Sequence, residues 1–241
     1  MLQVEHLSVT YPDGTAAIAE VSFTVADGES VALIGANGAG KTSLMLSLVG
    51  VLPCKGTVTL DGTSLSEATV PVIRQKAGLV FQDPDDQLFM PSLYDDLAFG
   101  LRNAGMAEAE IAPRINAVLA ELGIERLRRR TTLKLSGGEK RMAALATVLV
   151  MEPTLMLLDE PTAFLDPKAR RSLIHTLNAL HETKLIATHD LAFAAQVCKR
   201  SIIIKEGRIF ADGPSNTLLY DPVKMEEGGV EAIGADIAEG I

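Results

Sequence analysis

SVALIGANGAGKTSLMLSLVG, residues 30–50, is the stretch that decides the fold. It opens with a short apolar, β-branched run from Val31 to Ile34. Three glycines follow within six residues, and the next apolar residues, Leu44, Leu48 and Val49, have helical spacing. This order predicts a strand, a tight loop and a helix.

Gly35, Gly40, Lys41 and Thr42 match the phosphate-loop pattern, a glycine, four residues, and then Gly-Lys-Ser/Thr. Glycine accepts positive φ, so the backbone can wrap around an anion with its N–H groups pointing inward. In this interpretation Lys41 binds the β- and γ-phosphates, and the Thr42 hydroxyl reaches Mg²⁺. The alternative is a glycine-rich turn without a ligand. The strand-loop-helix context favours a nucleotide.

The composition indicates a globular protein. The chain has 241 residues, of which 47% are hydrophobic and 22% charged, with a formal net charge of −9. This length suits one large domain, or one with a subdomain. Because nucleic acids are bound through clustered Lys and Arg, the acidic balance disfavours a nucleic-acid partner.

Cysteine and hydropathy patterns exclude other classes of protein. Cys54 and Cys198 lie far apart, without Cys or His at metal-ligand spacing, so we expect reduced thiols and no zinc site. No apolar run approaches the 18 residues of a membrane span, and the N-terminus lacks a signal-peptide pattern. Any connection to a membrane must therefore go through a partner protein.

The N-terminal part alternates apolar and polar residues. Val4–Thr10 and Val21–Val25 predict two antiparallel strands. Tyr11 follows the first strand, either as an aromatic plate for adenine or as an ordinary strand-end tyrosine. Further on, a helix from about Leu93 and an amphipathic helix over 107–122 interrupt the β/α alternation. They predict a helical subdomain spanning roughly residues 85–150.

Two loops in this region carry charge. Asp83, Asp85 and Asp86 form either a solvated loop or an acidic socket for an arginine of a partner. Downstream, seven Lys or Arg residues lie within residues 126–141. Ser136-Gly-Gly-Glu139 has the capping-box spacing ahead of an apolar helix over 142–151. Its glycines leave the first-turn N–H groups open, which indicates a second anion site.

Carboxylates and a histidine follow two predicted strands. Leu155–Leu158 is a short apolar run bounded by prolines, typical of a buried parallel strand, and Asp159 and Glu160 end it. Ligands bind at this end of the strands in open α/β sheets, so we expect Asp159 to hold Mg²⁺ and Glu160 to activate water. His189 directly follows the strand Leu185–Thr188, where it could reach the γ-phosphate.

The C-terminal part predicts smaller elements. Asp166-Pro167 starts a helix that continues to His181. Ile202–Ile204 and Arg208–Asp212 form a hairpin, and a short helix covers 214–220. The acidic, Gly/Ala-rich residues 221–241 are interpreted as a mobile tail.

With these motifs in order, residues 1–220 resemble the nucleotide-binding subunits of ABC transporters. The resemblance implies an α/β fold, a P-loop NTPase core with an antiparallel β subdomain and an inserted α-helical subdomain. The matching motifs are the aromatic loop at Tyr11, the phosphate loop Gly35–Thr42, the glutamine loop at Gln82, the signature Leu135–Glu139, the Walker B strand Leu155–Glu160, the D-loop Leu165-Asp166 and the switch histidine His189.

The resemblance also implies the site and its cofactors, ATP and Mg²⁺. The implied catalytic residues are Glu160, His189, Lys41 and Gln82, and the implied metal ligands are Thr42, Gln82 and Asp159. The implied nucleotide contacts are Tyr11, Gly35, Asn37, Gly38, Ala39, Gly40, Lys41, Thr42, Ser43, Ser136, Gly137, Gly138, Glu139 and Asp166.

Proteins of this family act as two-fold symmetric pairs, which implies a homodimer with two ATP at the interface. Each ATP would lie between one chain's phosphate loop and the other chain's Ser136, Gly137 and Gly138. The basic stretch 126–141 would then lie near the partner's triphosphate. We expect neutralising Arg128 to Arg130 to weaken ATP-driven dimerisation.

The sequence of the glutamine loop, Phe81 to Phe89, is similar to that of the ATPases of energy-coupling-factor importers, which have a second glutamine at the position of Gln87. The text from Asp95 to Gly100 is most similar to the cobalt/nickel branch. The implied partners are an integral membrane coupling protein and a metal-binding membrane protein, with this chain peripheral on the cytoplasmic face of the cell membrane. Joint replacement of Asp85 and Asp86 by asparagine is expected to release the membrane partner.

One departure and three alternatives stay open. Phe164 stands where a small residue, often glycine, precedes the D-loop. The alternatives are an ABC importer of another solute, a soluble ABC protein without a transport role, and a P-loop kinase. A kinase leaves the signature and His189 unexplained, and the soluble ABC proteins usually carry tandem domains or long insertions.

Overall fold

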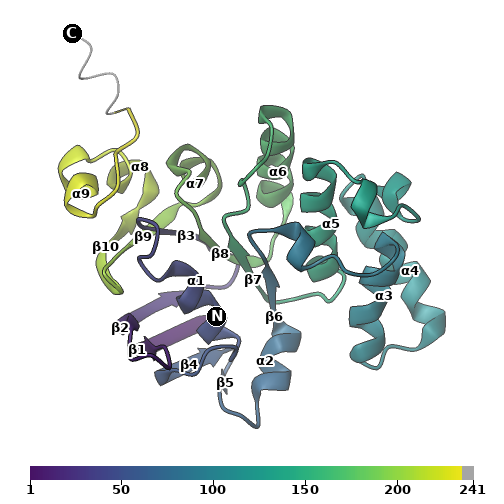
Figure 1. Cartoon of the computed structure of the whole chain (residues 1–241), viewed down its shortest axis with the longest axis horizontal. Coiled ribbons are helices and arrows are strands. Elements are labelled where there is room, and N and C mark those ends of the chain that lie inside the picture. The colour runs from purple at the N-terminus through teal and green to yellow at the C-terminus, as the bar shows by residue number, and fades with distance from the viewer. Residues whose placement is uncertain (235–241) are drawn as a thin grey trace.

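The larger of two sheets carries the phosphate loop in this computed structural model, which describes residues 1–234 (Figure 1). The strand order is β10-β9-β3-β8-β7-β6, with β10 antiparallel to β9 and the other neighbours parallel. Its strands are β3 Ser30–Ile34, β6 Ala77–Val80, β7 Leu155–Asp159, β8 Thr183–Ala187, β9 Arg200–Lys205 and β10 Arg208–Pro214.

Burial explains why these strands are so uniformly apolar. Both β7 and β8 are buried along their whole length, because helices and the second sheet cover the two faces. Since parallel strands end at one edge, the phosphate loop after β3, Gln82 after β6, Asp159 at the end of β7 and His189 after β8 meet at that edge.

The smaller sheet is antiparallel, with the order β2-β1-β4-β5. Its strands are β1 Leu2–Thr10, β2 Ala16–Val25, β4 Lys55–Leu60 and β5 Thr63–Ser64. Apolar side chains of this sheet, of helix α1 (Lys41–Leu48) and of one face of the large sheet form one continuous core. The predicted antiparallel pair is confirmed, and this core fixes α1 behind the phosphate loop.

Helices between β6 and β7 form a separate cluster, on the right in Figure 1. They are α3 Leu93–Asn103, α4 Glu108–Glu121 and α5 Gly137–Leu149, and short 3₁₀ turns lie at 84–86, 125–127 and 132–134. Helix α5 begins five residues before the predicted Met142. The capping box explains the difference, because Ser136 satisfies the first amide groups of the helix and starts it there.

The remaining helices are α2 Val70–Lys76, α6 Pro167–Ala179, α7 Leu191–Val197, α8 Ser215–Leu218 and α9 Pro222–Glu227. Helix α6 ends two residues before the predicted His181. In the part of the chain that the structure describes, no helix has the length and apolar character needed to span a bilayer.

The prediction of a mobile tail from residue 221 is wrong for residues 222–233. Asp221 caps α9, and Met225 on this helix is fully buried. Val230, Ala232 and Ile233 pack against the same core, and the amide of Ile233 donates to the carbonyl of Leu219. The prediction failed because it rested on the acidic, glycine-containing composition of this segment, which does not show that Met225 packs into the core. The last seven residues of the predicted tail, 235–241, lie outside the described residues.

Candidate active site

A cavity of about 450 Å³ lies at the carboxyl edge of the large sheet. The side chains and loops that line it are Tyr11, Thr15, Ala16, Ala17, Asn37, Gly38, Gly40, Lys41, Thr42, Ser43, Gln82, Asp159, Glu160 and His189. The fold thus brings together residues from five separate motifs. Gly35 and Ala39, two more of the predicted nucleotide contacts, are buried and are not among the residues that line this cavity.

Two glycines are required by the way the phosphate loop packs. Gly40 caps α1 with φ of 103°, and a Cβ atom there would lie 2.4 Å from the carbonyl oxygen of Ala17. A Cβ on Gly35 would lie 2.4 Å from the carbonyl oxygen of Ile204. Both positions exclude every other residue, because neighbouring backbone occupies the space a side chain needs.

Lys41 bends over the loop as a cation held by oxygen atoms. Its Nζ donates to the carbonyl oxygens of Gly35 at 2.7 Å and Ala36 at 3.2 Å, and lies 3.9 Å from Oε1 of Glu160. Burial lowers the pKa of Lys41, while Glu160 and Asp159 act in the opposite direction. The carbonyls occupy donor positions of the ammonium that phosphate oxygens could take over.

Asp159 and Thr42 form a pair of hard oxygen donors. The Thr42 hydroxyl donates to Oδ2 of Asp159 at 2.7 Å, whereas Oδ1 of Asp159 is buried without a hydrogen-bond partner in residues 1–234. Burial raises the pKa of Asp159. An unpartnered carboxylate oxygen beside a hydroxyl fits Mg²⁺, which takes one or two carboxylates together with phosphate oxygens. No cluster of three or more His, Cys, Asp or Glu able to hold a metal occurs among the described residues.

Glu160 is oriented toward the cavity from the end of β7. Its φ is 42°, and its amide donates to the carbonyl of Ala187. Oε2 accepts from the His189 amide at 3.2 Å, and the ring Nδ1 of His189 lies 2.9 Å from the same oxygen. The Glu160 side chain is buried, whereas His189 is 65% exposed. A buried, fixed carboxylate beside a phosphate loop can accept a proton from water.

Tyr11 and Gln82 both line this cavity. The Tyr11 hydroxyl is 2.8 Å from Oγ of Ser43, and its ring remains partly exposed to the cavity. The backbone carbonyl of Gln82 accepts from Arg141. Sequence reasoning missed the lining by residues 15–17, although these residues follow Tyr11 after three turn residues of the same hairpin.

The signature residues lie elsewhere in the chain. Ser136, Gly138, Glu139 and Asp166 line a different cavity of about 380 Å³, and Gly137 lines a third. The capping box is confirmed, since Ser136 Oγ accepts from the Glu139 amide and the Glu139 carboxylate accepts from the Ser136 amide. The two predicted anion sites of one chain therefore do not form a single pocket.

The arginines of the basic stretch, residues 126–141, contact different parts of the molecule. Arg126 pairs with Glu139 at 2.9 Å and lines the signature cavity. Arg128 lies over the ring of Tyr94, 4.5 Å from its centre. Of these two arginines, Arg126 lies beside the signature and Arg128 packs on Tyr94.

Comparison with known proteins identifies the family. Residues 18–163 match the family model described as ABC transporter. The chain belongs to the ABC transporter family. It is an ATP-binding subunit of that family and an ATPase, and the resemblance noted in the sequence is confirmed.

Two relatives illustrate the similarity of this ABC ATPase to others. The ABC transporter ATP-binding protein GSU1281 of Geobacter sulfurreducens is 46% identical over 219 residues, covering 90% of this chain and 88% of the relative. The cobalt import ATP-binding protein CbiO of Rhodobacter capsulatus is 40% identical, covering 95% and 84%.

Solved structures share the fold of this ABC ATPase. CbiO1 of Clostridium perfringens, part of the ABC transporter complex cbiONQ, has a TM-score of 0.84 and 35% identity, covering 98% of this chain and 96% of that chain. The ATP-binding cassette MJ0796, a dimer in a post-hydrolysis state with ADP and Pi, has a TM-score of 0.77 and 26% identity, covering 89% and 99%. The expected α/β P-loop architecture is therefore confirmed.

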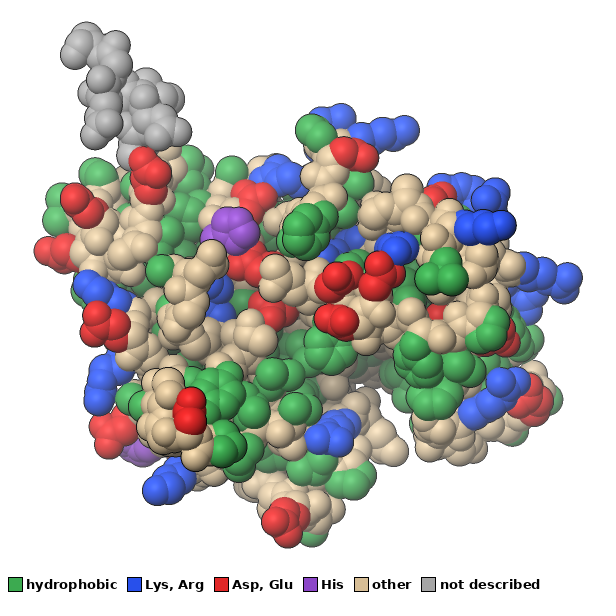
Figure 2. Space-filling view, viewed as in Figure 1, with side chains coloured by type: hydrophobic (Ala, Val, Ile, Leu, Met, Phe, Trp, Pro, Cys, Tyr) green, Lys and Arg blue, Asp and Glu red, His purple; other side chains and the backbone are tan. Residues whose placement is uncertain are grey.

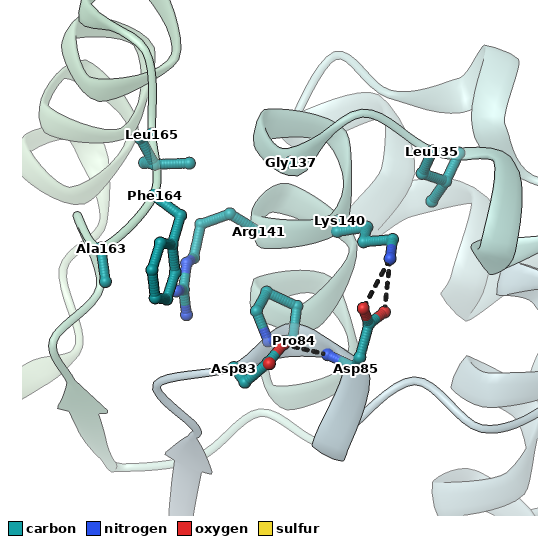
Figure 3. A pocket seen from close by; sticks show the side chains of 10 residues that line it. All are labelled: Asp83, Pro84, Asp85, Leu135, Gly137, Lys140, Arg141, Ala163, Phe164 and Leu165. Atoms are coloured by element: carbon teal, nitrogen blue, oxygen red, sulfur yellow. Dashed lines mark hydrogen bonds and ion pairs between the residues drawn. The ribbon is translucent and has the colours of Figure 1, made fainter.

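Phe164 has a strained backbone in this ABC ATPase. Its φ is 62° and its side chain is 85% exposed. A left-handed conformation costs a non-glycine residue about 1–2 kcal/mol. This explains physically why a glycine suits the position. The ring borders the third cavity, beside Arg141 (Figure 3).

Asp190, next to His189, supports the site through an ion pair. Its carboxylate accepts from Nε and Nη2 of Arg170 at 2.7 and 2.9 Å and from the Phe193 amide, capping α7. Burial alone would raise the pKa of Asp190, but the bonds from Arg170 and Phe193 outweigh it, so the pKa is lowered. The pair therefore stabilises the fold above the unfolded-state pKa and loses this contribution as pH falls through the lower folded-state pKa.

Replacing Asp190 by asparagine is expected to reduce the free energy of unfolding at pH 7 by about 1–3 kcal/mol, because a charge-assisted hydrogen bond is lost. The difference from wild type should narrow as pH falls below about 4, where the wild-type carboxylate becomes protonated. Urea denaturation at a series of pH values measures both. A difference that stays constant down to pH 3 would contradict this assignment.

Proposed function

We propose that this chain is the ATP-hydrolysing subunit of a membrane importer of the energy-coupling-factor type, with cobalt or nickel ions as cargo. It would act as a peripheral subunit on the cytoplasmic face of the cell membrane. Its similarity to CbiO, a cobalt import protein by name, supports this cargo. The observation that carries the membrane role is an exposed aromatic pair beside the glutamine loop, Phe89 and Phe99.

The chain's own residues would perform hydrolysis in the cavity at the sheet edge. Tyr11 would stack on adenine, and Lys41 would leave its carbonyl partners for the β- and γ-phosphates. Glu160 would take the proton of the attacking water, while His189 keeps the carboxylate oriented. Thr42, Asp159 and Gln82 would hold Mg²⁺, which neutralises phosphate charge when bound.

A second copy of the chain would complete each site. The phosphate loop and the signature line different cavities of one chain, and an isologous pair would set each signature against the other chain's nucleotide. The dimeric structure of the related cassette MJ0796 supports this arrangement. Phe164, which is 85% exposed on the loop before α6, would give the pair an apolar contact.

A docking surface for the membrane coupling protein lies over α3. Phe89 and Phe99 are 64% and 41% exposed, with ring centres 5.2 Å apart in an edge-to-face arrangement. Figure 2 shows hydrophobic side chains gathered in this region, beside a group of acidic ones. Asp85 is already paired with Lys140 at 2.6 Å, so Asp86 and the aromatic pair are the groups available to a partner. An amphipathic helix with basic residues would suit this surface.

Replacing Phe89 and Phe99 together by serine is expected to lower recovery of the membrane partner at least tenfold, because exposed aromatic anchors dominate such interfaces. The measurement is a pull-down from detergent-solubilised native membranes with tagged chain in MgATP. Phe210→Ser is the matched control, since Phe210 is also partly exposed but lies on β10. Unchanged recovery with the double variant would contradict the docking surface.

The same pull-down separates the cargo alternatives. Recovery of a small coupling protein together with a metal-binding membrane protein would support the cobalt/nickel importer, and uptake of ⁵⁷Co²⁺ or ⁶³Ni²⁺ would then distinguish the two ions. Recovery of a conventional permease pair would indicate an importer of another solute. Recovery of no membrane protein would favour an ABC ATPase without a transport role.

A further inference from the structure

Three links join residues 81–87, the glutamine loop, to helix α5. Arg141 donates through Nη1 to the carbonyl oxygen of Phe81 at 2.7 Å and through Nη2 to that of Gln82 at 2.6 Å. Gln87 accepts from the Phe81 amide at 3.1 Å and donates into the middle of α5, to the carbonyl of Ala144 at 2.9 Å. The third link is the ion pair between Asp85 and Lys140 (Figure 3).

Arg141 is buried to an unusual degree for a charged residue. It is 1% exposed, and its Nε has no hydrogen-bond partner in the described part of the chain. Burial lowers the pKa of Arg141 to about 10, so the guanidinium is charged at neutral pH. Burying a charge without a directly bonded carboxylate is costly. The buried guanidinium instead donates hydrogen bonds to two consecutive backbone carbonyls, those of Phe81 and Gln82.

Helix α5 connects this grip to the signature. The helix is capped by Ser136, and Arg141 follows five residues later, about 7.5 Å along the axis. The N-terminus of α5 therefore carries the residues that would meet the partner's nucleotide. About one and a half turns further along, the same helix carries Arg141, which binds the backbone carbonyl of Gln82. Gln82 lines this chain's own nucleotide cavity.

We propose that Arg141 is a positioning residue that couples the two nucleotide sites of the dimer, by making Gln82 move with α5. This inference rests on the proposed dimer and on the proposed role of Gln82. When the start of α5 engages the partner's nucleotide, the loop held by Arg141 shifts with the helix and brings Gln82 into place in the other site. Misplacement by about 1 Å is enough to cost up to a hundredfold in rate.

The coupling predicts a specific pattern of rates. Arg141→Lys keeps the charge but replaces the planar fork by one ammonium, so the two-carbonyl grip is lost. We expect kcat for ATP hydrolysis to fall about tenfold and the Hill coefficient for ATP to drop from above 1 to 1, with the Kd for ATP unchanged. In a Gln82→Ala background, Arg141→Lys should cause no further loss of kcat, because both changes remove the same placement.

A matched control exists on α4. Arg114 also donates to two carbonyl oxygens of the α5 region, those of Leu149 and Val150, at 3.2 and 3.0 Å, but it does not contact the glutamine loop. Arg114→Lys should leave kcat and the Hill coefficient unchanged. Thermal denaturation of each variant checks that the fold is intact.

Each outcome supports or overturns the inference. If Gln82→Ala leaves kcat unchanged, the proposed role of Gln82 itself fails. If Gln82→Ala lowers kcat but Arg141→Lys does not, or the two losses multiply, the coupling is wrong. Should Arg141→Lys not fold, Gln87→Ala releases the same loop from α5 and must show the same non-additive pattern.

Discussion

Replacement of Glu160 by glutamine is expected to lower the rate of ATP hydrolysis by about 10²- to 10⁴-fold, the range that general base catalysis contributes. The glutamine keeps the shape of the side chain but accepts a proton poorly. Glu160 is buried and lines the cavity beside the phosphate loop, and its carboxylate lies 2.9 Å from Nδ1 of His189. Phosphate release at saturating MgATP measures the effect.

Nucleotide binding and dimerisation provide the internal check on Glu160→Gln. The variant should bind ATP as tightly as wild type and elute as a dimer with MgATP, because only the chemical step is blocked. Glu152→Gln is the matched control, since Glu152 also has positive φ but lies on the surface next to Arg114. A Glu160→Gln variant that keeps a third of wild-type activity would show that another group activates the water.

Replacing Met225 by alanine is expected to reduce the free energy of unfolding by about 2–5 kcal/mol, as for other fully buried large-to-small changes. Met225 is 0% exposed and joins the core formed by the helices and one face of the large sheet. Both the lost apolar contact and the cavity left behind contribute. The shift of the urea midpoint measures the change.

Val223 provides the matched control on the same helix, α9. It is 63% exposed, so Val223→Ala should change the free energy of unfolding by no more than about 0.5 kcal/mol. Equal effects of the two substitutions would show that α9 does not pack as described. A large effect of Met225→Ala alone would establish that the C-terminal segment belongs to the folded domain.

Local motifs were predictable from the sequence because their geometry depends on neighbouring residues. The phosphate loop between β3 and α1, the capping box at Ser136 and the buried strand β7 all form from short stretches whose residue types favour one backbone conformation. Motif order also predicted that carboxylates and a histidine would meet at one sheet edge. Parallel strands make that outcome a matter of topology.

The long-range contacts of Met225 and Arg141 could not be predicted from local sequence. Met225 looked like part of an acidic tail, because composition cannot tell that one methionine will find a core formed by residues far away in sequence. Arg141 looked like one more residue of a basic stretch. Its bonds to Phe81 and Gln82 cross 60 and 59 positions of sequence.

The sequence by itself thus determined the local motifs of this protein: a glycine-rich loop ahead of α1, a carboxylate pair at the end of a buried strand and a capped helix, each encoded within a few consecutive residues. Only the tertiary structure decided how these motifs are placed relative to one another. It put the phosphate loop and the signature in different cavities, tied the glutamine loop to α5, and buried α9. The physical reason is that packing and hydrogen bonding between distant segments depend on the whole fold rather than on local residue preference.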